Sequence, residues 1–588
     1  MMRTFKPLDK LRASYLRKWV PLSLLVGIVA GLGAIILDKA ITYATDLFLG
    51  FGANYLPPSP PSPIVMLIDH PSLIPLITTL GGLLSGIIIY NLAPEAEGHG
   101  TDAAIDAFHH KKGEIRSRIP IIKLITSAIT IGSGGSAGKE GPAAQVSAGF
   151  GSFIGKLSRL NIHDRRILVA AGIGAGIGAI FKAPFGGALL GSEILYKRDF
   201  EVEVLIPSFI ASITGYSIFA SVMGFAPIFA HVTTYTFTNP WELIFYAILG
   251  IFCGLIGILY IKVFYKIKQI FHKSKINQIL KPALGGLIVG LVALFLPQVL
   301  GTSYGWLQLA INIDFAILPI EIMFLLIFAK IIATALTVGS GGSGGVFAPS
   351  LVIGGMVGGV TWYVCHILFL FSTLNPAPFV IVGMMAFFGG VGKAPISVIL
   401  MVGEMTGTYT LLVPSITATI LAYSITGDLS IYESQIATRA DSPAHRAGLN
   451  VSLLQRLKVK DAMNEDVITI KPENKISYVA KMMINERMKG LPVLKDEKMV
   501  GIITLKDVLQ VPKEAREKTF IDQIMSKKLI VTYPDESLYH AFGKIIGYEI
   551  GRLPVVDRTH PKKLLGIITR GDIVRKHEME VRLLLEAG

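Results

Sequence analysis

Gly132-Ser-Gly-Gly-Ser136 and Gly339-Ser-Gly-Gly-Ser343 are two copies of one glycine-rich stretch, far apart in strongly apolar sequence. Each copy is followed, at matched spacing, by a further glycine and then a proline. Other landmarks recur in the same order: Lys123 as Lys330, Leu80-Gly-Gly-Leu83 as Leu284-Gly-Gly-Leu287, and Lys182-Ala-Pro184 with Glu193 as Lys393-Ala-Pro395 with Glu404. Such repeats predict a duplicated membrane domain whose ligand site lies where the two copies meet.

The composition excludes an ordinary soluble protein. Mean hydropathy is +0.58, and only 16% of the 588 residues are charged. Residues 20–37 and 243–261 contain no Asp, Glu, Lys or Arg, and each run is long enough to cross a hydrocarbon core. Residues 331–392 also lack these residues but are broken by glycine and proline, so we expect several helices there, some too short to span. Broken helices at membrane depth line a cavity.

The N-terminal segment is basic, which predicts a cytoplasmic location by the positive-inside rule. The apolar run that follows is too long for a signal-peptide core, so we expect an anchored helix. The net charge of +14 comes largely from juxtamembrane Lys and Arg, and no basic face with interleaved aromatics occurs, so no nucleic-acid partner is expected. Neither an enzyme nor a metal site is expected, because phosphate-loop motifs are absent and Cys253 and Cys365 lack metal-site spacing.

After Arg439 the composition changes to that of a soluble α/β domain. This region contains a second repeat: Val459-Lys-Asp-Ala-Met463, Gly490-Leu-Pro-Val493 and Gly501-Ile-Ile-Thr504 return as Ile521-Asp-Gln-Ile-Met525, Arg552-Leu-Pro-Val555 and Gly566-Ile-Ile-Thr569. Short β-branched runs alternate with helical stretches, which predicts βαβ units. The repeat resembles a tandem pair of CBS domains, which are α/β modules, over about residues 458–577.

The CBS resemblance implies a nucleotide site. Thr504 with Asp507, and Thr569 with Asp572, would meet the ribose of an adenine nucleotide (ATP, ADP or AMP), since a hydroxyl and a carboxylate suit a neutral polyol. The alternative is that each Thr and Asp only caps the helix after its strand. Both interpretations stay open at the level of the sequence.

The glycine-rich turns predict an anion site. A turn that opens a helix exposes backbone N–H groups at the positive end of the helix dipole, and this end attracts anions. The alternative is that the glycines only allow close helix packing. Glu140 follows the first copy, and an ionisable residue within the membrane is usually functional. A carboxylate is itself an anion, so we expect Glu140 to compete with the permeant ion as a gate; the alternative is a permanent ion pair with Lys139.

Gly138-Lys-Glu-Gly-Pro142, Gly345-Val-Phe-Ala-Pro349 and Tyr432 resemble the motifs of the CLC family of chloride channels and chloride/proton exchangers. The resemblance implies a multi-pass α-helical membrane domain of two inverted repeats, with about eighteen helical segments. It also implies a homodimer with one pore in each subunit, and Glu140 as the gating glutamate. The implied anion-binding residues are His99, Gly100, Lys139, Gly141, Val346, Phe347, Ala348 and Tyr432.

Several of these positions carry alternatives. Tyr432 could instead be an interfacial aromatic near the end of the last membrane helix. Lys123 could add positive potential beneath the pore, or both it and Lys330 could be structural. Matched structural roles are expected for Glu193 and Glu404. The run His109, His110, Lys111 and Lys112 is interpreted as a solvated loop.

Two positions depart from the CLC pattern. His99 stands where the family usually has a serine whose hydroxyl contacts the ion, so anion selectivity among chloride, nitrate and fluoride is open. Asp102 replaces a proline nearby, and we expect it to partner His99. Ile194 stands where many exchangers have a proton-transferring glutamate, and an isoleucine cannot carry a proton.

We therefore expect a CLC-type chloride channel with passive conduction, modulated by the CBS pair. The alternatives are a chloride/proton exchanger with a non-standard proton path, and a CBS-regulated transporter of another ion. Expected partners are a second copy of the chain, membrane lipid, chloride or other small anions, and an adenine nucleotide, with both termini cytoplasmic. The expected segments are 1–18 (cytoplasmic), 19–440 (membrane domain, halves about 19–230 and 240–440), 441–457 (linker), 458–512 and 518–577 (CBS domains) and 578–588 (C-terminal tail).

Overall fold

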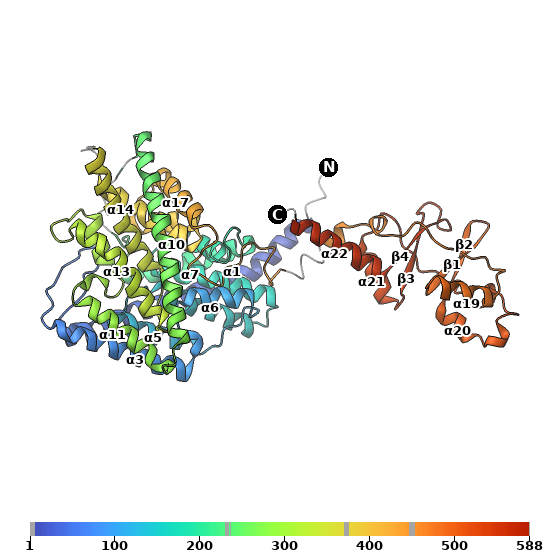
Figure 1. The fold of residues 1–588 in the computed structure, drawn as a ribbon, viewed down its shortest axis with the longest axis horizontal. Coiled ribbons are helices and arrows are strands. Elements are labelled where there is room, and N and C mark those ends of the chain that lie inside the picture. Colours follow the sequence, from blue (N-terminus) through green and yellow to red (C-terminus); the bar gives the residue numbers. More distant parts are fainter. Residues whose placement is uncertain (1–5, 230–234, 236, 370–374, 446–452, 587–588) are drawn as a thin grey trace. The chain divides into compact units, whose positions relative to one another are not determined.

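The computed structural model describes residues 6–229, 235, 237–369, 375–445 and 453–586. The chain divides into two compact units, Met1–Ala444 and His445–Gly588. The first is a bundle of helices and the second a smaller unit of short helices and strands (Figure 1). Parts of the expected segments 1–18, 441–457 and 578–588 lie outside the described residues.

The first half of the membrane unit opens with a long helix that contains the uncharged run 20–37. The α-helices of this half are α1 (Lys6–Thr45), α2 (Phe51–Ala53), α3 (Ile74–Leu92), α4 (Gly100–His109), α5 (Ile119–Gly132), α6 (Glu140–Leu157), α7 (Ile162–Ile180), α8 (Pro184–Glu193) and α9 (Leu205–Met223). Proline stands in the first turn of α5 and of α8, where its fixed φ and missing N–H suit a helix start.

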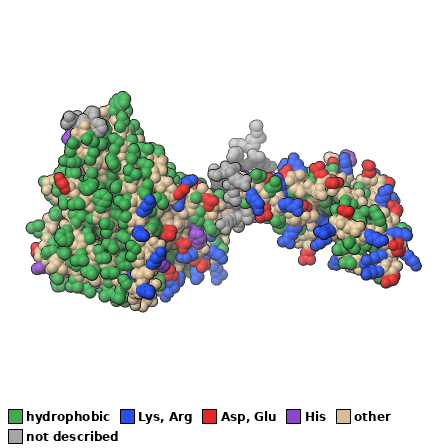
Figure 2. Space-filling view, viewed as in Figure 1, with side chains coloured by type: hydrophobic (Ala, Val, Ile, Leu, Met, Phe, Trp, Pro, Cys, Tyr) green, Lys and Arg blue, Asp and Glu red, His purple; other side chains and the backbone are tan. Residues whose placement is uncertain are grey.

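The second half repeats this order. Its α-helices are α10 (Leu243–Lys273), α11 (Lys281–Ala293), α12 (Tyr304–Ile311), α13 (Ile320–Gly339), α14 (Phe347–Phe369), α15 (Pro376–Gly392), α16 (Pro395–Thr406) and α17 (Leu412–Thr426). Residues 331–392 fall into several helices, as predicted. Within the described residues, six helices are long and apolar enough to cross a membrane, and apolar side chains cover most of the visible face of this unit (Figure 2).

The two halves pack in equivalent ways. In the first half α6 packs on α7 and α1 on α9, and in the second α14 packs on α15 and α10 on α17. Helix α3 meets its counterpart α11 at the Leu-Gly-Gly-Leu motifs. A Cβ on Gly82 would lie 2.3 Å from the Pro282 carbonyl oxygen, and one on Gly286 would lie 2.2 Å from that of Thr78. These repeated glycines therefore let two helix backbones touch.

The repeated lysines of the Lys-Ala-Pro motifs also have matched contacts. Lys182 and Lys393 both adopt the left-handed backbone region, with φ of 53° and 56°. The Lys182 ammonium donates to the Met223 carbonyl at 3.0 Å, at the end of α9. That of Lys393 donates to the Tyr423 carbonyl at 3.2 Å, in the last turn of α17. A cation at this position satisfies unpaired carbonyls and complements the helix dipole.

The second unit contains two antiparallel strand pairs. Its elements are α19 (Ile476–Asn485), β1 (Gly490–Lys495), β2 (Lys498–Thr504), α20 (Leu505–Gln510), α21 (Leu538–Gly547), β3 (Arg552–Val556), β4 (Leu564–Thr569) and α22 (Arg570–Glu586). The leading segment of each copy pairs with the other copy: the Asn464 N–H donates to the Ile567 carbonyl, and the Ser526 N–H to that of Ile502, both at 2.9 Å. The two sequence repeats therefore exchange segments and are not separate packing units.

Candidate functional site

The two Gly-Ser-Gly-Gly-Ser turns lie against each other. The Gly138 N–H donates to the Gly345 carbonyl at 2.8 Å, and the Gly345 N–H donates to the Gly138 carbonyl at 2.6 Å. Because these are equivalent residues of the two repeats, the reciprocal pair lies on a local twofold axis. Helices α6 and α14 begin just beyond, at Glu140 and Phe347, so their N-termini meet near this axis.

The N-terminus of α4 joins them. The Gly98 N–H donates to the Gly342 carbonyl at 3.0 Å, and the Gly344 N–H donates to the Gly98 carbonyl at 3.3 Å. A Cβ on Gly100, the first residue of α4, would lie 2.5 Å from the carbonyl oxygen of Gly141 in α6. Three helix N-termini thus converge, and their exposed N–H groups and dipoles favour an anion.

Two buried lysines hold equivalent connections in place. The Lys123 ammonium donates to the Ala96 and Gly98 carbonyls at 2.9 and 2.7 Å, just before α4. The Lys330 ammonium donates to the Val299 and Gly301 carbonyls at 2.9 and 2.8 Å, just before α12. Both lysines therefore make the same structural contact, and the segment before α12 is the counterpart of the segment before α4.

Glu140 lies at the meeting point of the helix ends. Its side chain is 1% exposed, and its Oε1 accepts a hydrogen bond from the Phe347 N–H at 2.7 Å. Its Oε2 has no hydrogen-bond partner among the described residues, and neither has the buried hydroxyl of Tyr304. Val346 and Ala348, on either side of Phe347, are fully buried. The Glu140 carboxylate therefore accepts from a backbone N–H group, that of Phe347, to which an anion could otherwise bind.

Two glycines leave room for this carboxylate. A Cβ on Gly138 would lie 2.0 Å from Glu140 Oε2, and one on Gly345 would lie 2.0 Å from Oε1. No other side chain fits either position unless Glu140 moves. The glycines of the repeated motif thus serve the site as well as helix packing.

Lys139 does not pair with Glu140, contrary to the alternative from the sequence. Its ammonium pairs with the Asp38 carboxylate of α1 at 2.5 Å. Both residues line a cavity of about 710 Å³, together with Lys182 and Tyr304. The cation is therefore neutralised by a partner far away in the sequence, beside a cavity that adjoins the site.

His99 precedes α4 and is 7% exposed. Its ring lies edge-on to that of Tyr432, with centroids 5.6 Å apart, and its Nδ1 has no hydrogen-bond partner within the described chain. The expected partnership with Asp102 is wrong. Asp102 instead accepts hydrogen bonds from the backbone N–H of Ser434 at 2.8 Å and from its hydroxyl at 2.9 Å.

Tyr432 lies in the irregular segment after α17 and is 2% exposed, so the interfacial alternative is wrong. Its ring also contacts that of Phe388, at a centroid distance of 6.3 Å. The Asp102–Ser434 hydrogen bonds tie this segment to α4 two residues beyond Tyr432. An acidic residue in place of the family's proline thereby holds the tyrosine beside His99.

Ile194 follows α8 and is fully buried. Its carbonyl accepts a hydrogen bond from the Gln435 side-chain amide at 2.9 Å. The preceding Glu193 accepts from the Ser397 N–H at 2.8 Å, and Glu404 accepts from the Gly186 N–H at 2.8 Å. The two glutamates therefore make equivalent contacts, as the repeat predicts.

The solvated-loop prediction is wrong for His109. This residue ends α4 and is fully buried, with Nδ1 2.8 Å from the Ser442 hydroxyl and Nε2 2.9 Å from the Leu195 carbonyl oxygen. His110, Lys111 and Lys112 are exposed, as expected. The apolar residues before His109 continue the buried face of α4, so the helix carries the imidazole into the core.

In the second unit, the expected nucleotide residues form capping boxes. Asp507 accepts from the backbone N–H of Thr504 at 2.8 Å and from its hydroxyl at 2.7 Å. Asp572 accepts from the backbone N–H of Thr569 at 2.9 Å and from its hydroxyl at 2.6 Å. Both Thr–Asp pairs therefore cap the helix that follows, as the capping interpretation predicts. The Oδ1 atom of each aspartate takes no part in these hydrogen bonds and is the carboxylate oxygen that could contact a ligand. A cavity of about 420 Å³ in this unit has other lining residues, among them Lys495 and Asp522.

Comparisons with known proteins agree with this architecture. The sequence model described as "Voltage gated chloride channel" matches residues 81–427, and that of the CBS domain matches 459–514 and 521–578. Uncharacterized protein MJ0305 of Methanocaldococcus jannaschii is 30% identical over 416 residues, which are 70% of this chain and 93% of that protein.

The chain belongs to the voltage gated chloride channel (CLC) family. The H(+)/Cl(-) exchange transporter ClcA of Salmonella agona is 28% identical over 465 residues, covering 75% of this chain and 94% of that protein. The crystal structure of a slow cyanobacterial Cl−/H+ antiporter is similar with a TM-score of 0.60 and 25% identity, over 70% of this chain and 96% of that one. The membrane unit thus has the CLC fold of two inverted repeats, followed by tandem CBS domains.

Three residues of the candidate site in this CLC protein were not predicted from the sequence: Asp38, Ser434 and Tyr304. Asp38 is the only acidic residue between Trp19 and Thr45, which is a signal for a partner within the membrane. Tyr304 follows Gly301, the counterpart of Gly98, so its place in the internal repeat is the signal for it. Ser434 carries no signal of its own, because its contact depends on how the segment after α17 returns to α4.

Proposed function

We propose that the protein transports chloride or another small anion past Glu140, and that this carboxylate is the gate. The hydrogen bond from the Phe347 N–H to Glu140 carries the proposal, because the carboxylate holds an amide at a helix N-terminus. Protonation or displacement of Glu140 would free this amide for the permeant anion. Oriented amides suit a permeating ion, since a full positive charge would hold it too tightly to leave.

The remaining anion ligands follow from the converging helices. The backbone N–H groups of Gly100, Gly141, Val346, Phe347 and Ala348 lie at the starts of α4, α6 and α14. The Tyr432 hydroxyl and the His99 ring would add side-chain donors from the other side, supported by their mutual contact. Lys139, held by Asp38, would set the charge at the adjoining cavity.

We propose passive conduction, that is, channel behaviour. The support is Ile194, a buried isoleucine at the position of the usual proton-transferring glutamate. The side chain has no group that titrates, so a proton would need another carrier.

A proton-coupled exchanger is the second candidate. It is favoured by the relatives, since one is an H(+)/Cl(-) exchange transporter and a structural neighbour is a Cl−/H+ antiporter. His99, with its unpartnered Nδ1, would then be a candidate proton carrier on a non-standard path.

Reconstituted protein distinguishes the two candidates. Liposomes are loaded with chloride, the voltage is clamped with valinomycin and potassium, and external pH is followed under an outward chloride gradient. A channel carries chloride without moving protons uphill. Sustained uphill proton movement that is lost in Glu140→Gln would establish the exchanger instead.

The gate itself is tested by chloride flux in Glu140→Gln. This variant mimics the protonated carboxylate, so we expect faster flux with little dependence on pH. Glu321→Gln, which removes an exposed carboxylate at the start of α13, is the matched control and should behave as the wild type. A folded Glu140→Gln protein with an unchanged pH response would argue against the gate.

For the second unit we propose regulation by an adenine nucleotide at Thr504, Asp507, Thr569 and Asp572, in a homodimer with cytoplasmic termini. ATP, ADP or AMP bound to the folded state should raise the melting temperature of the full-length protein by mass action. Asp507→Asn with Asp572→Asn should abolish the shift. Absence of any shift or calorimetric heat at millimolar nucleotide would leave these residues as helix caps only.

A further inference from the structure

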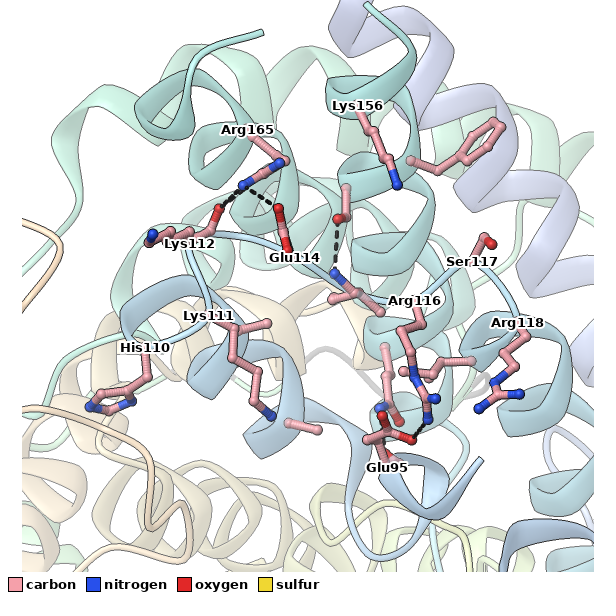
Figure 3. A pocket seen from close by; sticks show the side chains of 17 residues that line it. Glu95, His110, Lys111, Lys112, Glu114, Arg116, Ser117, Arg118, Lys156 and Arg165 are labelled. Carbon is pink, nitrogen blue, oxygen red and sulfur yellow. Dashed lines mark hydrogen bonds and ion pairs between the residues drawn. The ribbon is translucent and has the colours of Figure 1, made fainter. Parts of the chain in front are cut away.

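A second, strongly basic cavity lies apart from the Glu140 site, between the end of α4, the start of α5, the last turns of α6 and the start of α7 (Figure 3). Its volume is about 850 Å³. Six cationic side chains line it against two glutamates. They are Lys111, Lys112, Arg116, Arg118, Lys156 and Arg165, with Glu95 and Glu114.

Half of these cations already have a carboxylate partner. Arg116 pairs with Glu95, Arg165 with Glu114 and Lys111 with Asp106.

The other three cations, Lys112, Arg118 and Lys156, have no carboxylate partner in the part of the chain that the structure describes. Lys112 and Arg118 lie in the connection between α4 and α5, and Lys156 lies in the last turn of α6. Arg118 and Lys156 lie on one side of the cavity, whereas Lys112 lies across it, with its side chain directed away from them (Figure 3). Lysine and arginine placed in this way are typical ligands of a phosphate group.

Exposed apolar side chains continue from the basic ones. Arg118 directly precedes α5, and the exposed Ile121 lies three residues further on, in the first turn of that helix. On α6, Phe153 lies one turn before Lys156, lines the cavity and is 45% exposed, while Leu157 is 72% exposed. A cationic cavity beside an apolar helix surface is complementary to a phospholipid, in which an anionic headgroup adjoins acyl chains.

The cavity lies on the side of the membrane unit where α1 begins. Lys18 pairs with Asp164 at 2.5 Å, and the next residue along α7, Arg165, lines the cavity. If the basic N-terminal segment is cytoplasmic, the cavity faces the cytoplasmic leaflet, whose anionic lipids attract Lys and Arg.

We propose that this cavity binds the phosphate headgroup of an anionic phospholipid. Arg118 and Lys156 contact the headgroup, and the acyl chains lie along the exposed faces of α5 and α6. The site is distinct from the proposed anion path, yet one residue connects them. The Gln145 amide of α6 donates to the Glu95 carbonyl at 2.9 Å, and a Cβ on Gly100 would lie 2.8 Å from the Gln145 side chain.

Native mass spectrometry of the full-length protein in neutral detergent tests the proposal. The protein is titrated with dioleoylphosphatidylglycerol, with dioleoylphosphatidylcholine and with soluble glycerol 3-phosphate. We expect retention of the phosphatidylglycerol, and about thirtyfold weaker binding in Arg118→Gln with Lys156→Gln, since each basic residue near an anionic surface is worth about 1 kcal/mol. No ion gradient is used, so the result does not depend on anion transport.

The matched control is Lys273→Gln with Lys275→Gln, which removes two exposed lysines at the end of α10. It should bind the lipid as the wild type does. The site would be overturned if both double variants bound the lipid with wild-type affinity, or if both lost affinity to the same extent. Binding of glycerol 3-phosphate as tight as that of the lipid would overturn the lipid assignment in favour of a soluble phosphate. Melting temperatures without lipid verify folding. If Arg118→Gln with Lys156→Gln fails to fold, the single Lys156→Gln variant replaces it, and we then expect a partial loss of lipid affinity.

Discussion

Glu193, at the end of α8, accepts a hydrogen bond from the backbone N–H of Ser397, in the first turn of α16, at 2.8 Å. The reverse contact links the other ends of the same two helices. Glu404, near the end of α16, accepts from the N–H groups of Phe185 and Gly186 in α8 at 3.0 and 2.8 Å. Each short helix thus supplies the N-terminal cap of its counterpart, so the two repeats are joined by reciprocal ion–dipole contacts.

Removal of either cap should destabilise the membrane unit. Glu193→Ala leaves the Ile396 and Ser397 N–H groups without their carboxylate, and we expect a loss of about 2 kcal/mol, the typical cost of a lost charged cap. Glu404→Ala should have a comparable effect, because its contacts are equivalent. Melting temperature in detergent is the measurement. Glu321→Gln is the control, and melting of both Ala variants at the wild-type temperature would contradict the prediction.

Gly138→Ala should displace the Glu140 carboxylate, since the three atoms nearest to the added Cβ all belong to Glu140. Chloride flux should therefore rise toward that of Glu140→Ala. In the Glu140→Ala background the same glycine substitution should have little effect, because the clash is gone. This non-additivity is measured by liposome flux on the four proteins of the cycle. Equal effects of Gly138→Ala in both backgrounds would show that the glycine serves another contact.

The Asp102–Ser434 contact should hold Tyr432 in place. Asp102→Asn and Ser434→Ala each weaken the hydrogen bonds to the segment after α17, so each should lower thermal stability and alter chloride flux. The double variant should lose less than the two single losses added together, with a coupling of about 1 kcal/mol. Thermal melting of the four proteins measures this coupling. Strict additivity would mean that the two residues act independently.

The stability of the second unit should depend on Glu536 in a pH-dependent way. Burial alone would raise the pKa of Glu536, but hydrogen bonds from Lys544 and Thr532 outweigh this and hold the pKa below its ordinary value. A carboxylate with a lowered folded-state pKa stabilises the fold above its unfolded pKa of about 4.3 and loses this contribution as pH falls through the folded value. Glu536→Gln should therefore reduce stability near neutral pH and have little effect in strong acid.

Urea unfolding of the isolated segment 453–586 between about pH 3 and pH 7 measures this difference. Glu517→Gln, an exposed glutamate in the same unit, is the control. A wild-type minus Glu536→Gln difference that stays constant over this range would refute the prediction.

The sequence by itself determined the features that depend on neighbouring residues. Apolar runs, helix-breaking glycines and two internal repeats predicted the membrane helices, the site between the repeats and the tail of paired α/β modules. These features are readable because helix length, turn chemistry and capping are local. Glu140 could be identified for the same reason, since a carboxylate in an apolar, glycine-rich turn is recognisable from the neighbouring residues in the sequence.

The tertiary structure alone decided which distant groups meet. Lys139 pairs with Asp38 and not with adjacent Glu140, and Asp102 holds Ser434 and not His99. His109 belongs to a polar run in the sequence but is buried, because the buried face of α4 continues to its last residue. Partner choice of this kind depends on how helices far apart in the chain pack together, and a buried polar group binds the nearest complementary group in space.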